Sequence, residues 1–140
     1  MALRTAAVLS VGLLLLLIQG MLTDRGPATL PIRMSVVNDL SNMTPESYSS
    51  SVAEGGVLLG ALSRLQETQQ DFKFTVKVDP DFGLLLESVN GVGGSEGEQT
   101  YWEILSESSG ELTRLEVGIG CYTPQENEHI ILKFSTWSKQ

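Results

Sequence analysis

The chain has 140 residues, of which 17 are Asp or Glu and nine are Lys or Arg, so its formal net charge is −8. This length allows one domain with its own hydrophobic core but not two. The acidic surplus argues against nucleic acid and anionic membranes as partners, because both are negatively charged themselves.

The first twenty residues have the order of a secretory signal peptide. Arg4 precedes a largely apolar run over residues 6–18, and Gly20 supplies a small residue near a cleavage point. A helix over this run would cover about 20 Å, less than the roughly 30 Å hydrocarbon core of a membrane, so a membrane anchor is the weaker alternative. We expect residues 1–20 to be removed, 21–29 to form a flexible N-terminal segment and 30–140 to form one secreted domain.

Two strands are predicted before any helix. Leu30 to Val37 alternates imperfectly between apolar and polar residues and ends at residues that favour turns. A second, short strand is predicted near Tyr48 to Ala53. The connection between them contains Asn42-Met43-Thr44, which is an N-glycosylation sequon in a secreted chain, followed directly by Pro45. Asn42 is therefore the expected glycosylation site.

A helix is predicted over Gly56 to Gln69. Its apolar residues recur at spacings of three and four, which places them on one face; they are Leu58, Ala61, Leu62 and Leu65. Polar side chains occupy the remaining surface. The helix is therefore amphipathic and is expected to pack against a core.

Beyond the helix, the apolar period changes from 3.6 to 2, which indicates strands. Strands are predicted over Phe72 to Val78, Phe82 to Val89, Thr100 to Leu105, Leu112 to Ile119 and His129 to Trp137. A glycine-rich loop over residues 90–97 and turns over 106–110 and 122–128 separate them. One helix among about seven strands, with short connections, predicts an α+β fold in which a mainly antiparallel β-sheet packs on one amphipathic helix.

The residue pattern offers no site for catalysis or metal binding. His129 is the sole histidine and Cys121 the sole cysteine, whereas an activated nucleophile or a zinc site needs several such groups together. Asp79-Pro80-Asp81 has oxygen ligands suited to calcium, but no calcium-binding loop surrounds it. We therefore predict that the protein is not an enzyme, holds no metal and requires no cofactor.

The single cysteine also excludes an internal disulfide, so the core must hold the fold unless another chain supplies a second thiol. We expect Cys121 to be buried and inert, as free cysteines commonly are. Pairing with a partner chain is the alternative.

Tyr101 and Trp102 are adjacent on one predicted strand. Successive side chains on a strand point to opposite faces, so only one of these two can enter a given core. The other is a candidate anchor for a ligand or a partner protein.

Several segments together match the pattern of one known protein family. The main ones are Thr100 to Leu105, Gly118 to Pro124 and Glu128 to Ile130, with Phe134 and Trp137 near the end. Upstream, the order of first strand, helix, Phe72 to Phe74 and Gly83 to Asn90 also fits. Over about residues 31 to 137 the chain resembles the C-terminal β-domain of the cobalamin carriers, the family of intrinsic factor, transcobalamin and haptocorrin.

This resemblance implies a secreted, transcobalamin-like domain that covers one face of a cobalamin or related corrinoid while a helical barrel domain holds the rest. The ligand-facing residues that it implies are Tyr101, Trp102, Leu115, Gly118 and Tyr122. A chain of this length has no room for the barrel, so a separate barrel-domain chain or a receptor is a potential partner. The alternative is a secreted protein-interaction module that has lost its ligand.

Overall fold

A computed structural model describes residues 28–137 of the chain. The elements in chain order are β1 (Thr29–Asn38), β2 (Glu46–Ala53), α2 (Leu58–Thr68), β3 (Phe74–Asp79), β4 (Gly83–Val89), β5 (Val92–Gly93), β6 (Thr100–Ser108), β7 (Glu111–Arg114) and β8 (His129–Thr136). The expected signal peptide and most of the expected flexible segment lie outside the described residues. Within residues 28–137, one helix with mainly antiparallel strands confirms the predicted α+β class.

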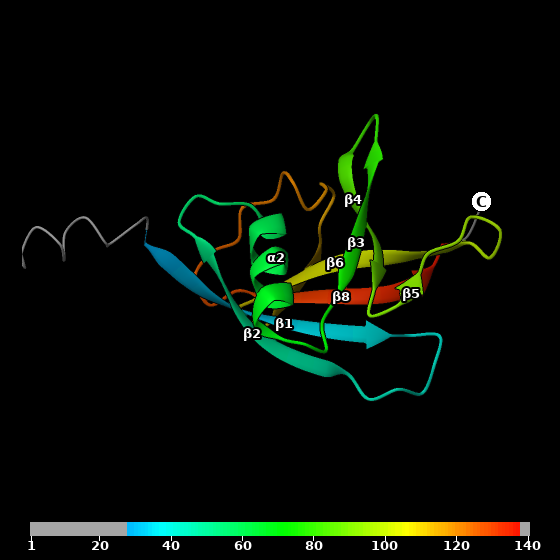
Figure 1. Ribbon diagram of the computed structural model, residues 1–140, viewed down its shortest axis with the longest axis horizontal. Helices are drawn as coiled ribbons and strands as arrows, with labels where there is room; N and C mark the ends of the chain where they lie inside the picture. Colours follow the sequence, from blue (N-terminus) through cyan, green and yellow to red (C-terminus); the bar gives the residue numbers. More distant parts are fainter. Residues whose placement is uncertain (1–27, 138–140) are drawn as a thin grey trace, which may run out of the picture.

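The strands form two sheets. The larger has the order β2-β1-β8-β6-β7, and the smaller has the order β3-β4-β5. Within the larger sheet β1 and β8 run parallel, while the other neighbouring strands are antiparallel. Figure 1 shows β8, in red, between β1, in cyan, and β6, in yellow, with the β3–β4 hairpin rising away from this sheet. The first and last described strands therefore lie side by side.

One face of the larger sheet carries the core. Alternate residues of its central strands are buried there, as the strand period requires, and they include Met34, Trp102, Leu132 and Phe134. The predicted stripe of α2 is buried against them, and β4 adds Leu86 and Val89. The helix and the smaller sheet thus share one hydrophobic core with the larger sheet.

The N-terminus of α2 is satisfied by a distant segment. Val57 at the N-cap makes no side-chain hydrogen bond. The N–H of Leu58 donates to the carbonyl of Tyr122 at 2.8 Å, and the N–H of Leu59 donates to the carbonyl of Ile119 at 2.9 Å. Because the first N–H groups of a helix need acceptors, this contact fixes the 119–122 segment against the helix.

The strand predicted over Leu112 to Ile119 is wrong beyond Arg114, where β7 ends. The following backbone turns away from β6 because other elements take its hydrogen bonds. The N–H of Ile119 donates to the carbonyl of Leu84 at 3.2 Å, and its carbonyl accepts from α2. Gly118 lies so close to β4 that a Cβ there would clash with the carbonyl oxygens of Leu84 and Phe82.

The glycine-rich loop also differs from the prediction, because it contains β5. Asn90 and Gly91, with φ values of 50° and 84°, join β4 to β5 in a two-residue hairpin turn. Asn-Gly is the dipeptide that such a turn favours, since both of its central residues need positive φ. This pair was the sequence signal for the hairpin.

Candidate functional site

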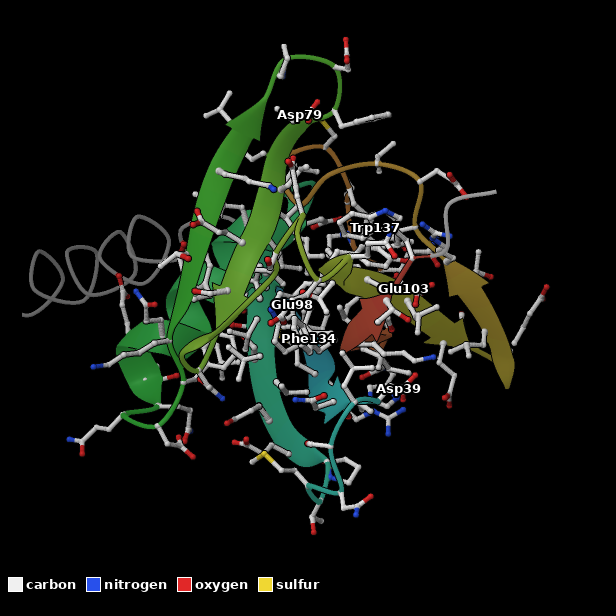
Figure 2. The ribbon with its side chains drawn as sticks, turned by 90° about the vertical axis from the view of Figure 1, so that its right-hand side faces the viewer. Asp39, Asp79, Glu98, Glu103, Phe134 and Trp137 are labelled. Carbon is white, nitrogen blue, oxygen red and sulfur yellow. The ribbon has the colours of Figure 1, made fainter. Side chains whose placement is uncertain are left out.

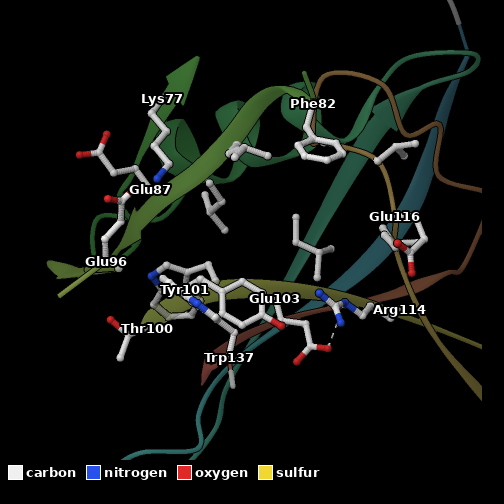
Figure 3. Close-up of a pocket in the computed structure, with 18 of the residues that line it drawn as sticks. Lys77, Phe82, Glu87, Glu96, Thr100, Tyr101, Glu103, Arg114, Glu116 and Trp137 are labelled. Atoms are coloured by element: carbon white, nitrogen blue, oxygen red, sulfur yellow. Dashed lines mark ion pairs between the residues drawn. The ribbon is translucent and has the colours of Figure 1, made fainter. Parts of the chain in front are cut away.

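A cavity of about 620 Å³ opens between the β3–β4 hairpin, β6 and the segment that follows β7. Phe82, Leu85 and Glu87 line it from the hairpin side, and Leu115 and Gly118 line it after β7. Figure 3 shows Lys77, Glu87 and Phe82 across the cavity from Tyr101 and Glu103. Three segments that are far apart in the sequence therefore build one concave surface.

The floor of the cavity is a partly unpaired edge of β6. β7 pairs only with Leu105 to Ser108, and just beyond it the N–H of Leu115 donates to the carbonyl of Ile104 at 2.9 Å. At the other end, Ser95 forms an isolated bridge with Thr100. The strand pairings of the described residues leave the edge between these two points without a neighbour.

Tyr101 and Trp102 take the two different places that strand alternation predicts. The Trp102 side chain packs in the core at 5.1 Å from the Phe134 ring, and its indole Nε1 donates to the carbonyl of Val92 at 2.8 Å. Tyr101 is half-buried on the opposite face, with its ring 5.8 Å from the Trp137 ring. Both residues line the cavity, and Tyr101 is the outward-facing member of the pair.

A positively charged side chain also lies beside the Tyr101 ring. The Arg114 guanidinium lies 5.7 Å from the centre of the Tyr101 ring, and its Nε is 3.5 Å from Oε1 of Glu103. In Figure 2, Glu103 and Trp137 lie near each other beside β6, whereas Asp79 lies away at the tip of the β3–β4 hairpin. Tyr101 is therefore held between an aromatic and a cationic neighbour.

The charges around the cavity are unequal. Four carboxylates line it, against two cations; the carboxylates are Glu87, Glu96, Glu103 and Glu116, and the cations are Lys77 and Arg114. Since Glu103 is paired with Arg114, three carboxylates face one remaining cation. The cavity therefore favours neutral or cationic ligands over anions.

Four of the five residues expected at the ligand site line this one cavity, namely Tyr101, Trp102, Leu115 and Gly118. Tyr122 lies outside its lining. The Tyr122 hydroxyl donates to Oε2 of the buried Glu128 at 2.6 Å, and Ser106 donates to the same oxygen at 2.7 Å. Burial raises the pKa of Tyr122 above its ordinary value, and the hydrogen bond to Glu128 raises it further.

The hairpin side of the cavity was missed by the sequence analysis. Phe82, Leu85 and Glu87 were assigned only to a strand, because nothing local shows which distant element faces them. An exposed aromatic was one available signal, since Phe82 follows Asp79-Pro80-Asp81, a typical turn sequence, and 61% of it is exposed.

Three other residues singled out in the sequence lie outside the cavity lining. Cys121 is exposed, so the prediction that it is buried is wrong; its N–H closes a surface turn by donating to the carbonyl of Gly118 at 3.0 Å. Asn42 is exposed in the β1–β2 connection. His129 is half-buried beside Ser35, with 2.7 Å between Nε2 and Oγ.

Two negative findings apply to residues 28–137. These residues contain no cluster of three or more His, Cys, Asp or Glu that could hold a metal ion. Over the same range, no helix has the length and apolar character needed to cross a membrane.

Comparison with known proteins gives several relatives. No family model matches the chain. Three curated proteins named cobalamin binding intrinsic factor align with it: 35% identical over 92 residues in Canis lupus familiaris, 33% over 109 residues in Mus musculus and 33% over 92 residues in Homo sapiens. The alignments cover 66%, 78% and 66% of this chain but 21%, 24% and 21% of the relatives. The chain thus spans less than a quarter of their length.

Solved structures share the fold. Haptocorrin in complex with Cbi matches with a TM-score of 0.66 and 22% identity, over 79% of this chain and 26% of that chain. A candidate metal-binding protein from Ruminococcus gnavus matches with a TM-score of 0.55 and 13% identity, over 78% of this chain and 99% of that chain. At these identities the likeness concerns the fold alone.

Proposed function

Because this chain is similar in sequence and fold to the C-terminal β-domain of the cobalamin carriers, we propose that it is a secreted domain that binds a corrinoid on one face. The carriers to which it is similar are named for binding, and the proposed role needs no catalytic group. The ligand is cobalamin or a close relative of it.

The observation that carries this proposal is the cavity beside β6. It is large enough for part of a broad ligand, and apolar and aromatic side chains from three segments line it. Tyr101 and Leu115 are half-buried there. A flat macrocycle that covered these side chains would gain burial of apolar area without first displacing the core.

The cavity is open on one side, which sets the expected strength of binding. A domain that contacts one face of a ligand buries about half of its surface, and the free energy of binding falls accordingly. We expect micromolar or weaker affinity for cobalamin by this domain alone. A separate barrel-domain chain, or a receptor that covers the other face, would strengthen it.

Calorimetric titration of the purified domain with cobalamin tests the proposal, first alone and then in the presence of an isolated barrel domain of a carrier. Binding by the domain alone, or tighter binding in the mixture than by either part, is the expected result. No heat from the domain alone at millimolar cobalamin, together with an affinity in the mixture equal to that of the barrel domain by itself, would reject the corrinoid function.

The exposed hairpin favours a second function. Val78 and Phe82 are 79% and 61% exposed, and they lie near each other at the tip of the β3–β4 hairpin. Exposed apolar side chains that gather in one place are a feature of protein interfaces. If cobalamin does not bind, a secreted protein-interaction module becomes the leading proposal.

A further inference from the structure

We propose that the backbone of Trp102 binds a carboxamide group in the cavity, and that this contact makes the domain select amide-bearing ligands over their carboxylate analogues. This inference rests on the proposed corrinoid function and adds the group by which the ligand is read.

The backbone groups of Thr100, Trp102 and Ile104 point away from β8. In an antiparallel pair, successive residues of a strand direct their N–H and C=O groups alternately to its two neighbours. The carbonyl of Ile104 accepts from Leu115, and the N–H and carbonyl of Thr100 bond with Ser95. Trp102 lies two residues from each, so its N–H and C=O point to the same side.

The hydrogen bonds of β8 independently support this direction of the Trp102 backbone groups. Trp102 faces Phe134 across the β6–β8 pair. The carbonyl of Phe134 accepts from the N–H of Asp39 at 3.1 Å, so it is turned toward β1 and not toward Trp102. The strand pairings of residues 28–137 thus leave both backbone groups of Trp102 free at the cavity floor.

The open stretch of edge is too short for another strand. Ser95 closes it at Thr100, and Leu115 closes it at Ile104. Four residue steps along a strand cover about 13 Å, and both ends are occupied in the plane of the sheet. An extended peptide therefore cannot continue past Trp102, whereas a single small polar group fits between the two closures.

The free pair consists of one donor and one acceptor. A primary carboxamide carries the complementary pair, because its oxygen accepts and its nitrogen donates. A carboxylate can accept from the N–H of Trp102, but it leaves the carbonyl facing a second acceptor. The three carboxylates in excess around the cavity, Glu87, Glu96 and Glu116, oppose an added negative charge as well.

The apolar surroundings of Trp102 increase the free-energy penalty for leaving its carbonyl without a hydrogen-bond donor. Trp102 is 7% exposed, and Leu85, Ile104 and Leu115 line the same cavity. A ligand that covered them would exclude water from the unpaired carbonyl, and a buried polar group without a partner is destabilising. Sites built to hydrogen-bond one group reject an analogue that lacks it for this reason.

The test compares cobalamin with its separate monocarboxylic acid derivatives, each of which has one peripheral amide converted to an acid. At neutral pH, we expect one derivative to bind at least about tenfold more weakly than the other acids, because one amide meets Trp102. Repulsion by the carboxylates would weaken all acids similarly. The Glu87→Gln variant serves as a control, because it should reduce the general repulsion and keep the difference between isomers.

Amide exchange measured by NMR provides the readout on the protein. Without ligand, the Trp102 N–H should exchange faster than those of Tyr101 and Glu103, which point toward β8, and saturation with cobalamin should slow it. If cobalamin binds while all acids bind alike and Trp102 gains no protection, this inference fails and the corrinoid function stands. If cobalamin itself does not bind, both fail.

Discussion

Two adjacent residues, Tyr101 and Trp102, have different roles because a strand turns their side chains to opposite faces. The Trp102 side chain belongs to the core and donates its indole N–H to Val92. Tyr101 is half-buried outside the core, where its ring lies beside Trp137 and Arg114. A substitution at Tyr101 therefore separates binding from folding.

We predict that Tyr101→Ala weakens cobalamin binding by about 1 to 3 kcal/mol, the value of one buried apolar side chain, and changes the melting temperature little. Calorimetry and thermal unfolding of the same samples check this. Tyr101→Phe is the matched control, since it keeps the ring and should retain affinity. Unchanged affinity in a folded Tyr101→Ala variant would remove Tyr101 from the site.

Tyr122 is expected to behave in the opposite way. Its hydroxyl donates to the buried Glu128, so Tyr122→Phe should lower the free energy of unfolding by about 1.5 to 3 kcal/mol, the usual worth of a hydrogen bond to a charged group. Cobalamin affinity should stay the same, because the residue lies outside the cavity lining. Urea unfolding and calorimetry measure the two effects. A loss of affinity at full stability would return Tyr122 to the ligand site.

Alkaline pH should destabilise the protein through its tyrosines. Burial, with the hydrogen bond to Glu46, raises the pKa of Tyr48 from 10.0 to about 12, and the pKa of Tyr122 is also raised. A raised pKa means that the folded state binds the proton more tightly than the unfolded state. This stability is complete below about pH 10 and is lost as the pH rises through 12.

Urea midpoints measured from pH 8 to pH 12 check this prediction. The pairing of Lys133 with Asp39 raises the pKa of Lys133 and contributes in the same pH range. The Tyr48→Phe variant isolates the tyrosine effect, and its midpoints should fall less steeply than those of the wild type. Equal slopes for the two proteins would show that Tyr48 does not contribute.

At the scale of elements, the segment between β7 and β8 is held by contacts that only a glycine at position 118 allows. A Cβ on Gly118 would meet the carbonyl oxygen of Phe82 at 2.8 Å and clash also with that of Leu84. Backbone atoms at that distance must move apart. The same segment caps α2, so a shift there disturbs the helix as well as the cavity.

We predict that Gly118→Ala lowers the free energy of unfolding by about 1 to 3 kcal/mol, as overpacking does. Gly60→Ala is the matched control, since a Cβ on Gly60 in α2 would meet nothing within 4 Å. It should stabilise the protein by up to about 1 kcal/mol through helix propensity. Urea unfolding measures the change in free energy of unfolding for each variant. Similar changes in both would contradict the close contact of Gly118 with β4.

The elements differ in how far their own sequence predicts them. The spacing of Leu58, Ala61, Leu62 and Leu65 was enough for α2, because helix periodicity is local. The end of β7 at Arg114 was not predictable, since its cause lies in β4 and α2. Only one side of the cavity was predictable from the sequence. The alternation of side chains along a strand separated Tyr101 from Trp102, but no local pattern indicates that the β3–β4 hairpin lies opposite them.

At the scale of the whole molecule, the proposed function requires export. We predict that protein collected from culture medium begins within a few residues of Met21 and carries N-linked glycan, if any, at Asn42. The apolar run over residues 6–18 and the exposed sequon are the reasons. Intact-mass measurement before and after enzymatic removal of glycans tests both points. A chain that retains residues 2–20 would contradict the signal peptide.

The parallel pairing of β1 with β8 has a consequence for the order in which the protein folds. β8 is the last strand of the larger sheet to be synthesised, and it joins the β1–β2 pair to the β6–β7 pair. Until β8 has emerged, these two halves have no common sheet and expose the edges that it covers. Contacts between strands so far apart in the sequence also make folding slow. We therefore expect the larger sheet to be completed only after β8 has been synthesised, and a chain whose sheet is still incomplete can be threaded through a translocation pore.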